Sequence, residues 1–269
     1  MRFQYISDIH LETRNSIIKS IGLEKFVTNK LRLKKLADNL FLLGDIGDPH
    51  SQIYNDFIKY CSDNWRNVFV IYGNHEFYTS KRKRIDMNIT RAKIFPDNVY
   101  FLDNNKKYID ASNNVSDTRT DSSIKILGST LWSNISVSAQ QYMNDYCKIW
   151  LNEKSLTGEM TRNMFHINKN WIFEELSEII PTILLTHHGV NNICNGPYIG
   201  GELESAFATD IDFSNYPHLK VCINGHTHVS LNTFIPNTTI KLLANCYGYP
   251  GEDIGIVKYK PDSVYQLVV

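Results

Sequence analysis

The feature that most constrains the fold of this 269-residue chain is a pattern that occurs five times along it. In each case a short apolar run of strand length is followed at once by acidic, amide or imidazole side chains. The central example runs from residues 41–43 through Gly44 to Asp45 and Asp48. The other four runs lead to the following residues: Asp8 and His10; Asn74, His75 and Glu76; His187 and His188; His226 and His228. Because α/β sheets gather ligand sites at the carboxyl ends of their strands, the ordered set predicts one shared site.

The segments between these runs predict an α/β fold, with βα units first and antiparallel strands last. Amphipathic spacing predicts an entry loop and a helix within residues 15–39, and helices over about residues 49–61, 78–95 and 161–180. Short strands are expected at residues 99–102, 107–109 and 124–127, with a long polar and mobile hairpin loop at 110–123. Period-two alternation predicts antiparallel strands of a second sheet at residues 229–234, 239–243, 255–259 and 264–268. No linker is visible, so we expect a single domain over residues 1–269.

The charge balance argues against polyanionic partners. Lys plus Arg and Asp plus Glu both number 28, so no net field attracts long nucleic acid or an anionic membrane. The first residues are expected to form a strand rather than a signal peptide, because they contain no apolar h-region, and no apolar run elsewhere reaches the length of a membrane span. Five scattered cysteines without a CxxC pair indicate reduced thiols and exclude a thiolate metal site. We therefore expect a soluble cytoplasmic protein whose oligomeric state the sequence does not indicate.

The strand-end residues offer oxygen and nitrogen ligands for metal ions. The candidate ligands are Asp8, His10, Asp45, Asn74, His187, His226 and His228. Mixed imidazole and carboxylate donors suit Mn, Fe or Zn, and also Co or Ni, rather than Mg or Ca. A centre of two divalent ions needs one shared carboxylate, which Asp45 can supply. At the strand end that carries two adjacent histidines, either His187 or His188 could be the ligand.

These motifs resemble the signature of the calcineurin-like metallophosphoesterases. The resemblance rests on the motif residues Asp8-x-His10, Gly44-Asp45-x-x-Asp48, Gly73-Asn74-His75-Glu76, His187 and Gly225-His226-x-His228. It implies one metal held by Asp8, His10, Asp45 and His228, and a second held by Asp45, Asn74, His187 and His226. It also implies a four-layer α/β/β/α sandwich of two mixed sheets flanked by helices.

The same resemblance implies how the reaction proceeds. A metal-bridging hydroxide would attack phosphorus, while Asn74 and His75 contact the substrate. His75 would bind the phosphoryl oxygen or protonate the leaving group, with Asp48 orienting it. Further stretches, including Leu11-Glu12, Gly73 to Tyr78, Met143 to Tyr146 and Tyr249 to Glu252, resemble a group of compact bacterial-type phosphoesterases. Where that group carries Pro-Arg, this chain has Cys246-Tyr247, which removes a potential phosphate contact.

The sequence favours a hydrolase that acts on small phosphate esters, with phosphodiester or promiscuous activity ahead of phosphomonoester activity. A catalytically silent protein-binding scaffold is the alternative from another class, but such a protein would usually have lost ligands or His75. The basic run at residues 81–84 is either a phosphate-attracting rim or, more simply, a solvated helical turn.

Overall fold

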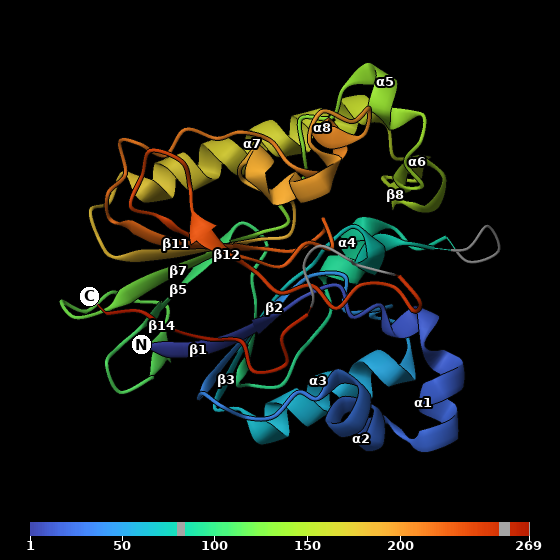
Figure 1. The fold of residues 1–269 in the computed structure, drawn as a ribbon, viewed down its shortest axis with the longest axis horizontal. Helices are drawn as coiled ribbons and strands as arrows, with labels where there is room; N and C mark the ends of the chain where they lie inside the picture. The colour runs from blue at the N-terminus through green and yellow to red at the C-terminus, as the bar shows by residue number, and fades with distance from the viewer. Residues whose placement is uncertain (80–83, 253–258, 269) are drawn as a thin grey trace.

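The computed structural model describes residues 1–79, 84–252 and 259–268, and it places two mixed sheets face to face between layers of helices (Figure 1). The first sheet has the order β14-β1-β2-β3-β4 and contains β1 (Arg2–Ile6), β2 (Asn39–Leu43), β3 (Asn67–Ile71), β4 (Val99–Phe101) and β14 (Val264–Gln266). The second sheet has the order β12-β13-β11-β10-β7-β5-β6. Its strands are β5 (Asn105–Ile109), β6 (Val115–Ser116), β7 (Ile124–Ser129), β10 (Thr182–Thr186), β11 (Leu219–Asn224), β12 (Leu231–Phe234) and β13 (Lys241–Ala244).

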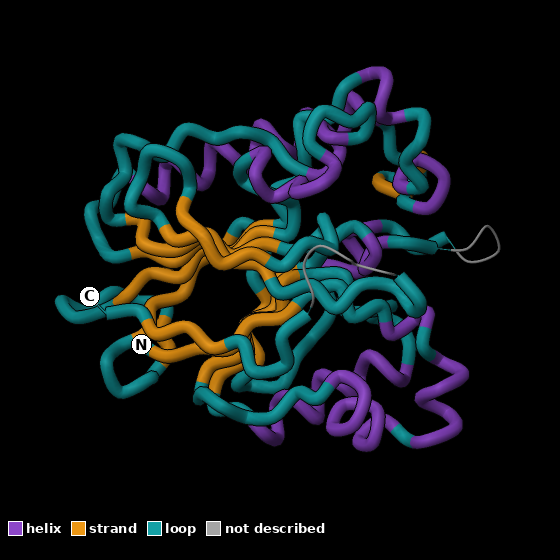
Figure 2. Tube along the Cα trace, in the orientation of Figure 1, coloured by secondary structure: helices purple, strands orange, loops and turns teal. Residues whose placement is uncertain are grey.

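Helices cover the outer face of each sheet, as Figure 2 shows. The first sheet is covered by α1 (Asn15–Ile21), α2 (Leu23–Lys25), a π-helical segment (Phe26–Leu31) and α3 (Gln52–Asn64). The second sheet is covered by α7 (Gly158–Leu176) and α8 (Glu204–Phe207). The predicted fold of two mixed sheets flanked by helices is thus confirmed.

Side-chain alternation along the strands builds the two kinds of core. Phe41 and Leu43 of β2 belong to the cluster between the sheets, together with Ile183 and Leu185 of β10. The intervening Leu42 belongs instead to a cluster that it shares with the buried side of the helices. Because both faces of these strands are buried, their sequences are continuous runs of apolar residues. The strands are therefore held rigidly, and so are the loops that leave their ends.

The remaining elements lie around the carboxyl ends of the strands. They are the 3-10 turns Leu11–Thr13, His75–Phe77 and Asn192–Tyr198, the helices α4 (Met87–Arg91), α5 (Val137–Gln140) and α6 (Asp145–Lys148), and the hairpin β8 (Trp150–Leu151) with β9 (Lys154–Ser155). Within the described residues, no helix has the length and apolar character that a membrane crossing requires.

The helices predicted over residues 49–61 and 161–180 are present as α3 and α7, although α7 begins and ends a few residues earlier than predicted. Ser51 caps α3 by accepting a hydrogen bond from the Tyr54 amide at 3.2 Å, and Thr157 caps α7 in the same way. The helix predicted over residues 78–95 is wrong in its extent, because α4 is the only helix among the described residues of that segment. Asp86 has an extended backbone and caps α4, so the helix cannot begin earlier in the described part of this segment.

The prediction for the C-terminal strands needs two corrections, and part of it lies outside the described residues. Strand β14 pairs antiparallel with β1 and so joins the first sheet instead of the second. Strand β13 pairs in parallel with β11 on one side. On its other side it pairs antiparallel with β12. Of the strand predicted at residues 255–259, positions 255–258 lie outside the described residues and Tyr259 is not in a strand. Alternation identifies a strand but not its partner, because the pairing depends on distant residues.

Candidate metal centre

The candidate ligands converge at the carboxyl ends of five strands. Asp8 and His10 follow β1, Asp45 follows β2, and Asn74 follows β3. The second sheet contributes His187 after β10, and His226 and His228 after β11. Five of the seven candidates have a positive φ, namely Asp8, His10, Asp45, His226 and His228. Backbone of this kind is unfavourable for residues other than glycine and concentrates at functional sites.

One group of ligands combines Asp8, His10 and His228, whose donor atoms lie within 4.8 Å of one another. The Nε2 atoms of His10 and His228 face each other at 3.1 Å. His228 Nε2 also lies 3.5 Å from Asp8 Oδ1. All three residues are buried, so these donors face one another instead of water. The group matches three of the four ligands expected for the first metal.

The second group combines Asp45, His187 and His226. Asp45 Oδ1 lies 3.3 Å from His187 Nε2, whereas its other oxygen, Oδ2, lies 3.9 Å from His10 Nε2. The two oxygens of this one carboxylate therefore face imidazoles of different groups. Asp45 is placed to share two ions, as a bridging ligand must be.

Buried atoms without hydrogen-bond partners provide a test of whether the site fits metal ions. Asn74 Oδ1 and His226 Nε2 are buried without a partner, and His187 Nε2 makes no hydrogen bond despite its approach to Asp45. Buried polar atoms are rarely left unpaired, because their desolvation is costly. These three atoms are the donors expected for the second metal besides Asp45. The residues therefore fit a divalent ion with oxygen and nitrogen ligands.

Hydrogen bonds on the far side of three rings direct their Nε2 atoms into the site. His187 Nδ1 bonds to the Leu43 carbonyl at 2.8 Å, His10 Nδ1 to Glu12 Oε1 at 3.0 Å, and His228 Nδ1 to Glu252 Oε2 at 2.7 Å. Each acceptor favours a proton on Nδ1, so Nε2 is the atom that is left to bind a metal. The rings are thus oriented as metal ligands commonly are.

The charge states of two buried groups, Asp45 and His226, suit metal binding. Burial alone would raise the pKa of Asp45, but His187 and the neighbouring imidazoles hold it well below its ordinary value. Burial lowers the pKa of His226, and the adjacent His188 and His187 lower it further. The site therefore contains an ionised carboxylate beside a neutral imidazole, the forms that bind metal. Burial lowers the pKa of His187 and His228, but nearby carboxylates outweigh it and raise the pKa of His187 to about 9 and of His228 to about 10, so an ion would displace a proton from those two rings.

Glu76 joins two of the ligand loops. Its carboxylate accepts hydrogen bonds from the backbone amides of Asp45 at 2.8 Å, Ile46 at 2.7 Å and Gly73 at 2.7 Å. Close packing adds to this restraint, since a Cβ atom on Gly73 would collide with Asp45 Oδ1 and the His187 ring. Asp45 and the loop after β3 are consequently held in one fixed relation.

His75 lies at the edge of this ligand set. Its Nδ1 is hydrogen-bonded to Glu12 Oε1 at 3.1 Å, and its Nε2 to the Tyr249 hydroxyl at 2.9 Å. Its ring stacks on Tyr78, with centroids 4.1 Å apart. Burial lowers the pKa of His75, but Asp45 and Glu12 outweigh it and raise the pKa above its ordinary value. His75 also forms a possible third ligand group with His10 and Asp45.

The structure does not place Asp48 against His75 as the sequence led us to expect. The Asp48 side chain accepts a hydrogen bond from the His50 amide at 2.9 Å, next to the start of α3. Glu12 occupies the predicted orienting position because the turn Leu11–Thr13 carries it back beneath both His10 and His75.

His187, not His188, is a member of the ligand groups. His188 Nδ1 faces the Thr130 carbonyl at 3.2 Å, and its ring lies beside His226 with centroids 4.2 Å apart. Burial lowers the pKa of His188 to about 3, with a further contribution from His187. His188 therefore packs behind the site as a neutral ring.

Several residues at the site received no role from the sequence. Glu12 and Glu252 orient imidazoles, and Tyr249 contacts His75. Asp145 accepts hydrogen bonds from Asn74 Nδ2 at 2.8 Å and from the Tyr78 hydroxyl at 2.6 Å, which turns Asn74 Oδ1 toward the site. All of these residues lie in stretches noted for their resemblance, and that resemblance was the only available signal.

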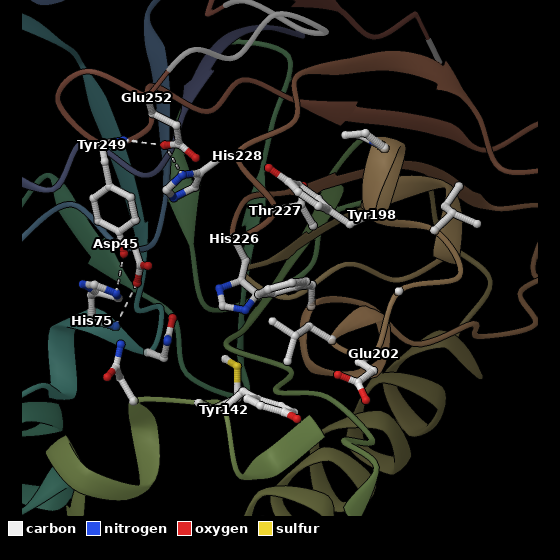
Figure 3. Close-up of a pocket in the computed structure, with 18 of the residues that line it drawn as sticks. Asp45, His75, Tyr142, Tyr198, Glu202, His226, Thr227, His228, Tyr249 and Glu252 are labelled. Atoms are coloured by element: carbon white, nitrogen blue, oxygen red, sulfur yellow. Dashed lines mark hydrogen bonds and ion pairs between the residues drawn. The ribbon is translucent and has the colours of Figure 1, made fainter. Parts of the chain in front are cut away.

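A cavity of about 770 Å³ opens beside the ligands (Figure 3). Asp45, His75, His226 and His228 line one side of it, and Tyr142, Tyr198 and Glu202 lie across from them. Of the basic run at residues 81–84, only Arg84 is described. Its guanidinium lies over the Trp150 ring, 3.8 Å from the centroid, so this residue is engaged in a local contact.

Comparisons with known proteins show a family and a related fold. A family model described as calcineurin-like phosphoesterase matches residues 1–230. An uncharacterised protein of Acanthamoeba polyphaga mimivirus is 26% identical over 295 residues, covering 99% of this chain and 98% of that protein. The structure of a phosphopantetheinyl hydrolase from Mycobacterium tuberculosis has a TM-score of 0.62 at 16% identity, covering 92% of this chain and 89% of that one. A dimetal phosphatase from Danio rerio has a TM-score of 0.38 at 14% identity, covering 91% and 86%.

We expect Asp45→Asn to reduce bound metal sharply without unfolding the protein, because it removes the charge that faces both ligand groups. Metal content per chain, measured by mass spectrometry after reloading with Mn, checks this. Asp48→Asn is the matched control and should retain the metal of the unchanged protein. Equal metal content in all three proteins would contradict a shared role for Asp45.

We expect Glu76→Gln to lower the free energy of unfolding by about 1–3 kcal/mol, because an amide NH₂ group would face buried N–H donors. Denaturant unfolding of the metal-free protein measures this effect. Glu174→Gln changes an exposed glutamate of α7 and should stay within about 0.5 kcal/mol of the unchanged protein. Equal stability of the two variants would contradict the conclusion that the Glu76 carboxylate stabilises the two ligand loops.

Proposed function

The chain belongs to the calcineurin-like phosphoesterase family and is therefore a metal-dependent phosphoesterase, and we propose that it hydrolyses small phosphodiesters at a centre of two divalent ions. The observation that carries this proposal is the position of Asp45 between two groups of ligands. We propose Mn, Fe or Zn as the ions, because the donors mix imidazole nitrogen with carboxylate and amide oxygen. A single domain over residues 1–269 and a cytoplasmic location remain predictions.

Seven residues would hold the ions in this proposal. Asp8, His10, Asp45 and His228 would bind one, and Asp45, Asn74, His187 and His226 the other. When bound, the ions would supply an activated water and neutralise charge on the phosphoryl oxygens.

His75 is our candidate for the general acid. Glu12 holds its Nδ1, so Nε2 is the atom that can carry a proton toward the cavity. Nε2 now contacts the Tyr249 hydroxyl, and a substrate oxygen could take the place of that hydroxyl. His75 would then bind a phosphoryl oxygen or protonate the departing alcohol. Glu12 would act as a positioning residue, in the role first assigned to Asp48.

The charge of the cavity favours a diester over a monoester. None of the described lining residues is Lys or Arg, whereas the acids Glu202 and Glu252 are among them. A monoester dianion carries one more charge than a diester and would have to rely on the ions and His75 alone for its neutralisation. The complete ligand set argues against a silent scaffold. The zero net charge of the chain argues against a long nucleic acid as substrate.

We expect His75→Asn to lower kcat about 10²–10⁴-fold while both ions remain bound, because it removes a proton donor but no proposed ligand. Initial rates and metal content per chain should be measured on the same preparation. Glu12→Gln should cause a smaller loss, since it weakens only the support of His75. Full activity in His75→Asn would exclude the acid role, and loss of an ion would instead make His75 a ligand.

We expect metal-stripped protein reloaded with Mn to hydrolyse bis(p-nitrophenyl) phosphate at least about tenfold faster than p-nitrophenyl phosphate, as the absence of described lining cations suggests. Release of p-nitrophenol measures both rates, and Asp45→Asn serves as the inactive control. The reverse preference would replace the diester proposal by a phosphomonoesterase. Bound metal without turnover of either compound would contradict the proposed activity on simple esters.

A further inference from the structure

We propose that the cavity beside the metal centre contains a subsite for an uncharged aromatic group carried by the substrate, an inference that rests on the proposed function. The subsite, here called the aromatic wall, consists of Tyr142, Tyr198, Leu203 and Phe207. These residues come from the segments around α5 and α8, outside the strand ends that supply the ligands (Figure 1).

The aromatic wall is continuous with the metal centre. The Phe207 ring lies beside the candidate ligand His226, with centroids 5.3 Å apart. Tyr198 lies beside Phe207 in turn, with centroids 6.2 Å apart. A single cavity is lined by all three residues and by Asp45. A phosphate held at the ligands can therefore place an attached group against Phe207 and Tyr198.

The aromatic wall leaves apolar surface exposed where a folded protein usually buries it. Tyr142 is 55% exposed and Tyr198 is 47% exposed, and both face the same cavity. Exposed aromatic side chains around a cavity are a common feature of ligand sites, because flat rings stack on one another and exclude water. Figure 3 shows the two tyrosines on the opposite side of the cavity from Asp45 and His75.

The aromatic wall is supported from behind by a small core of its own. Ala139 of α5 and Ala206 of α8 are buried in one cluster, against which Leu203 and Phe207 pack. The Ser136 amide bonds to Ser205 Oγ at 3.0 Å and ties the two segments together. Leu203 and Phe207 are thus held in place before any ligand arrives, which reduces the entropy lost on binding.

Charge selects among the groups that this wall could accept. Glu202 lies at the cavity, and no described lining residue is Lys or Arg. A second anionic group at this position would meet a carboxylate and no described cation. An uncharged ring, such as an aryl group or a nucleobase without a further phosphate, can pack on the apolar side chains and is not repelled by Glu202.

The test is a comparison of binding that does not depend on turnover. Methylphosphonate and phenylphosphonate carry the same metal-binding head and differ only in the attached group. Calorimetric titration of Mn-loaded protein should show phenylphosphonate binding about tenfold or more tightly, as expected for a partly buried ring. A carboxylate at the para position of the ring should cancel most of this gain.

Variants of the wall residues test whether the preference for phenylphosphonate arises at the aromatic wall. Tyr142→Ala combined with Tyr198→Ala should reduce the phenyl-to-methyl ratio toward one and leave methylphosphonate affinity unchanged. Phe234→Ala is the matched control, because Phe234 is a 53% exposed aromatic of β12 that does not line the cavity. The control should keep the ratio of the unchanged protein.

The outcomes separate this inference from the proposed function. Equal binding of the two phosphonates, or a ratio that survives in the double variant, would overturn the aromatic wall even if phosphodiesters are hydrolysed. A phenyl preference that the double variant removes would support it even if the model diesters are not turned over. Equal affinity for the para-carboxylated ring would refute the selection against anions.

Discussion

The site depends above all on the burial of one carboxylate, Asp45, among imidazoles contributed by both sheets. An isolated buried charge would be strongly unfavourable, and Asp45 is tolerated because His187 and His10 face its two oxygens. The same arrangement requires the carboxyl ends of β1, β2 and β10 to stay in a fixed position relative to one another. The packed layer between the sheets, with Phe41 and Ile183 in its core, maintains these positions.

Carboxylates that would not themselves bind metal determine the orientation of the groups that would. Glu12 and Glu252 each hold an imidazole through Nδ1, Asp145 turns the amide of Asn74, and Glu76 holds the backbone at Asp45. The protein thereby fixes its rings before any ion binds, which lowers the reorganisation that binding requires. Glu12 contacts both His10 and His75, so it connects the proposed metal shell to the proposed acid.

Chemistry and substrate selection are carried by different parts of the chain. The proposed ligands follow buried strands, where the backbone is rigid. The aromatic wall lies instead on short helices and turns that pack against each other around Ala139 and Ala206. Such a division would let the segments around Tyr142 and Tyr198 change the preferred substrate without disturbing Asp45. Function often lies in loops that a rigid scaffold positions.

The two mixed sheets were implied by the family resemblance, while the sequence by itself determined the α/β class, the helix start at Ser51 and the set of candidate ligands. These features are local, because burial on both faces makes a strand apolar and a ligand follows directly at its end. Only the tertiary structure decided that β14 pairs with β1, that Glu12 rather than Asp48 contacts His75, and that Tyr198 lies across a cavity from Asp45. Each of these is a contact that the residue's own neighbours in the sequence do not specify, since it exists only after distant segments have packed together.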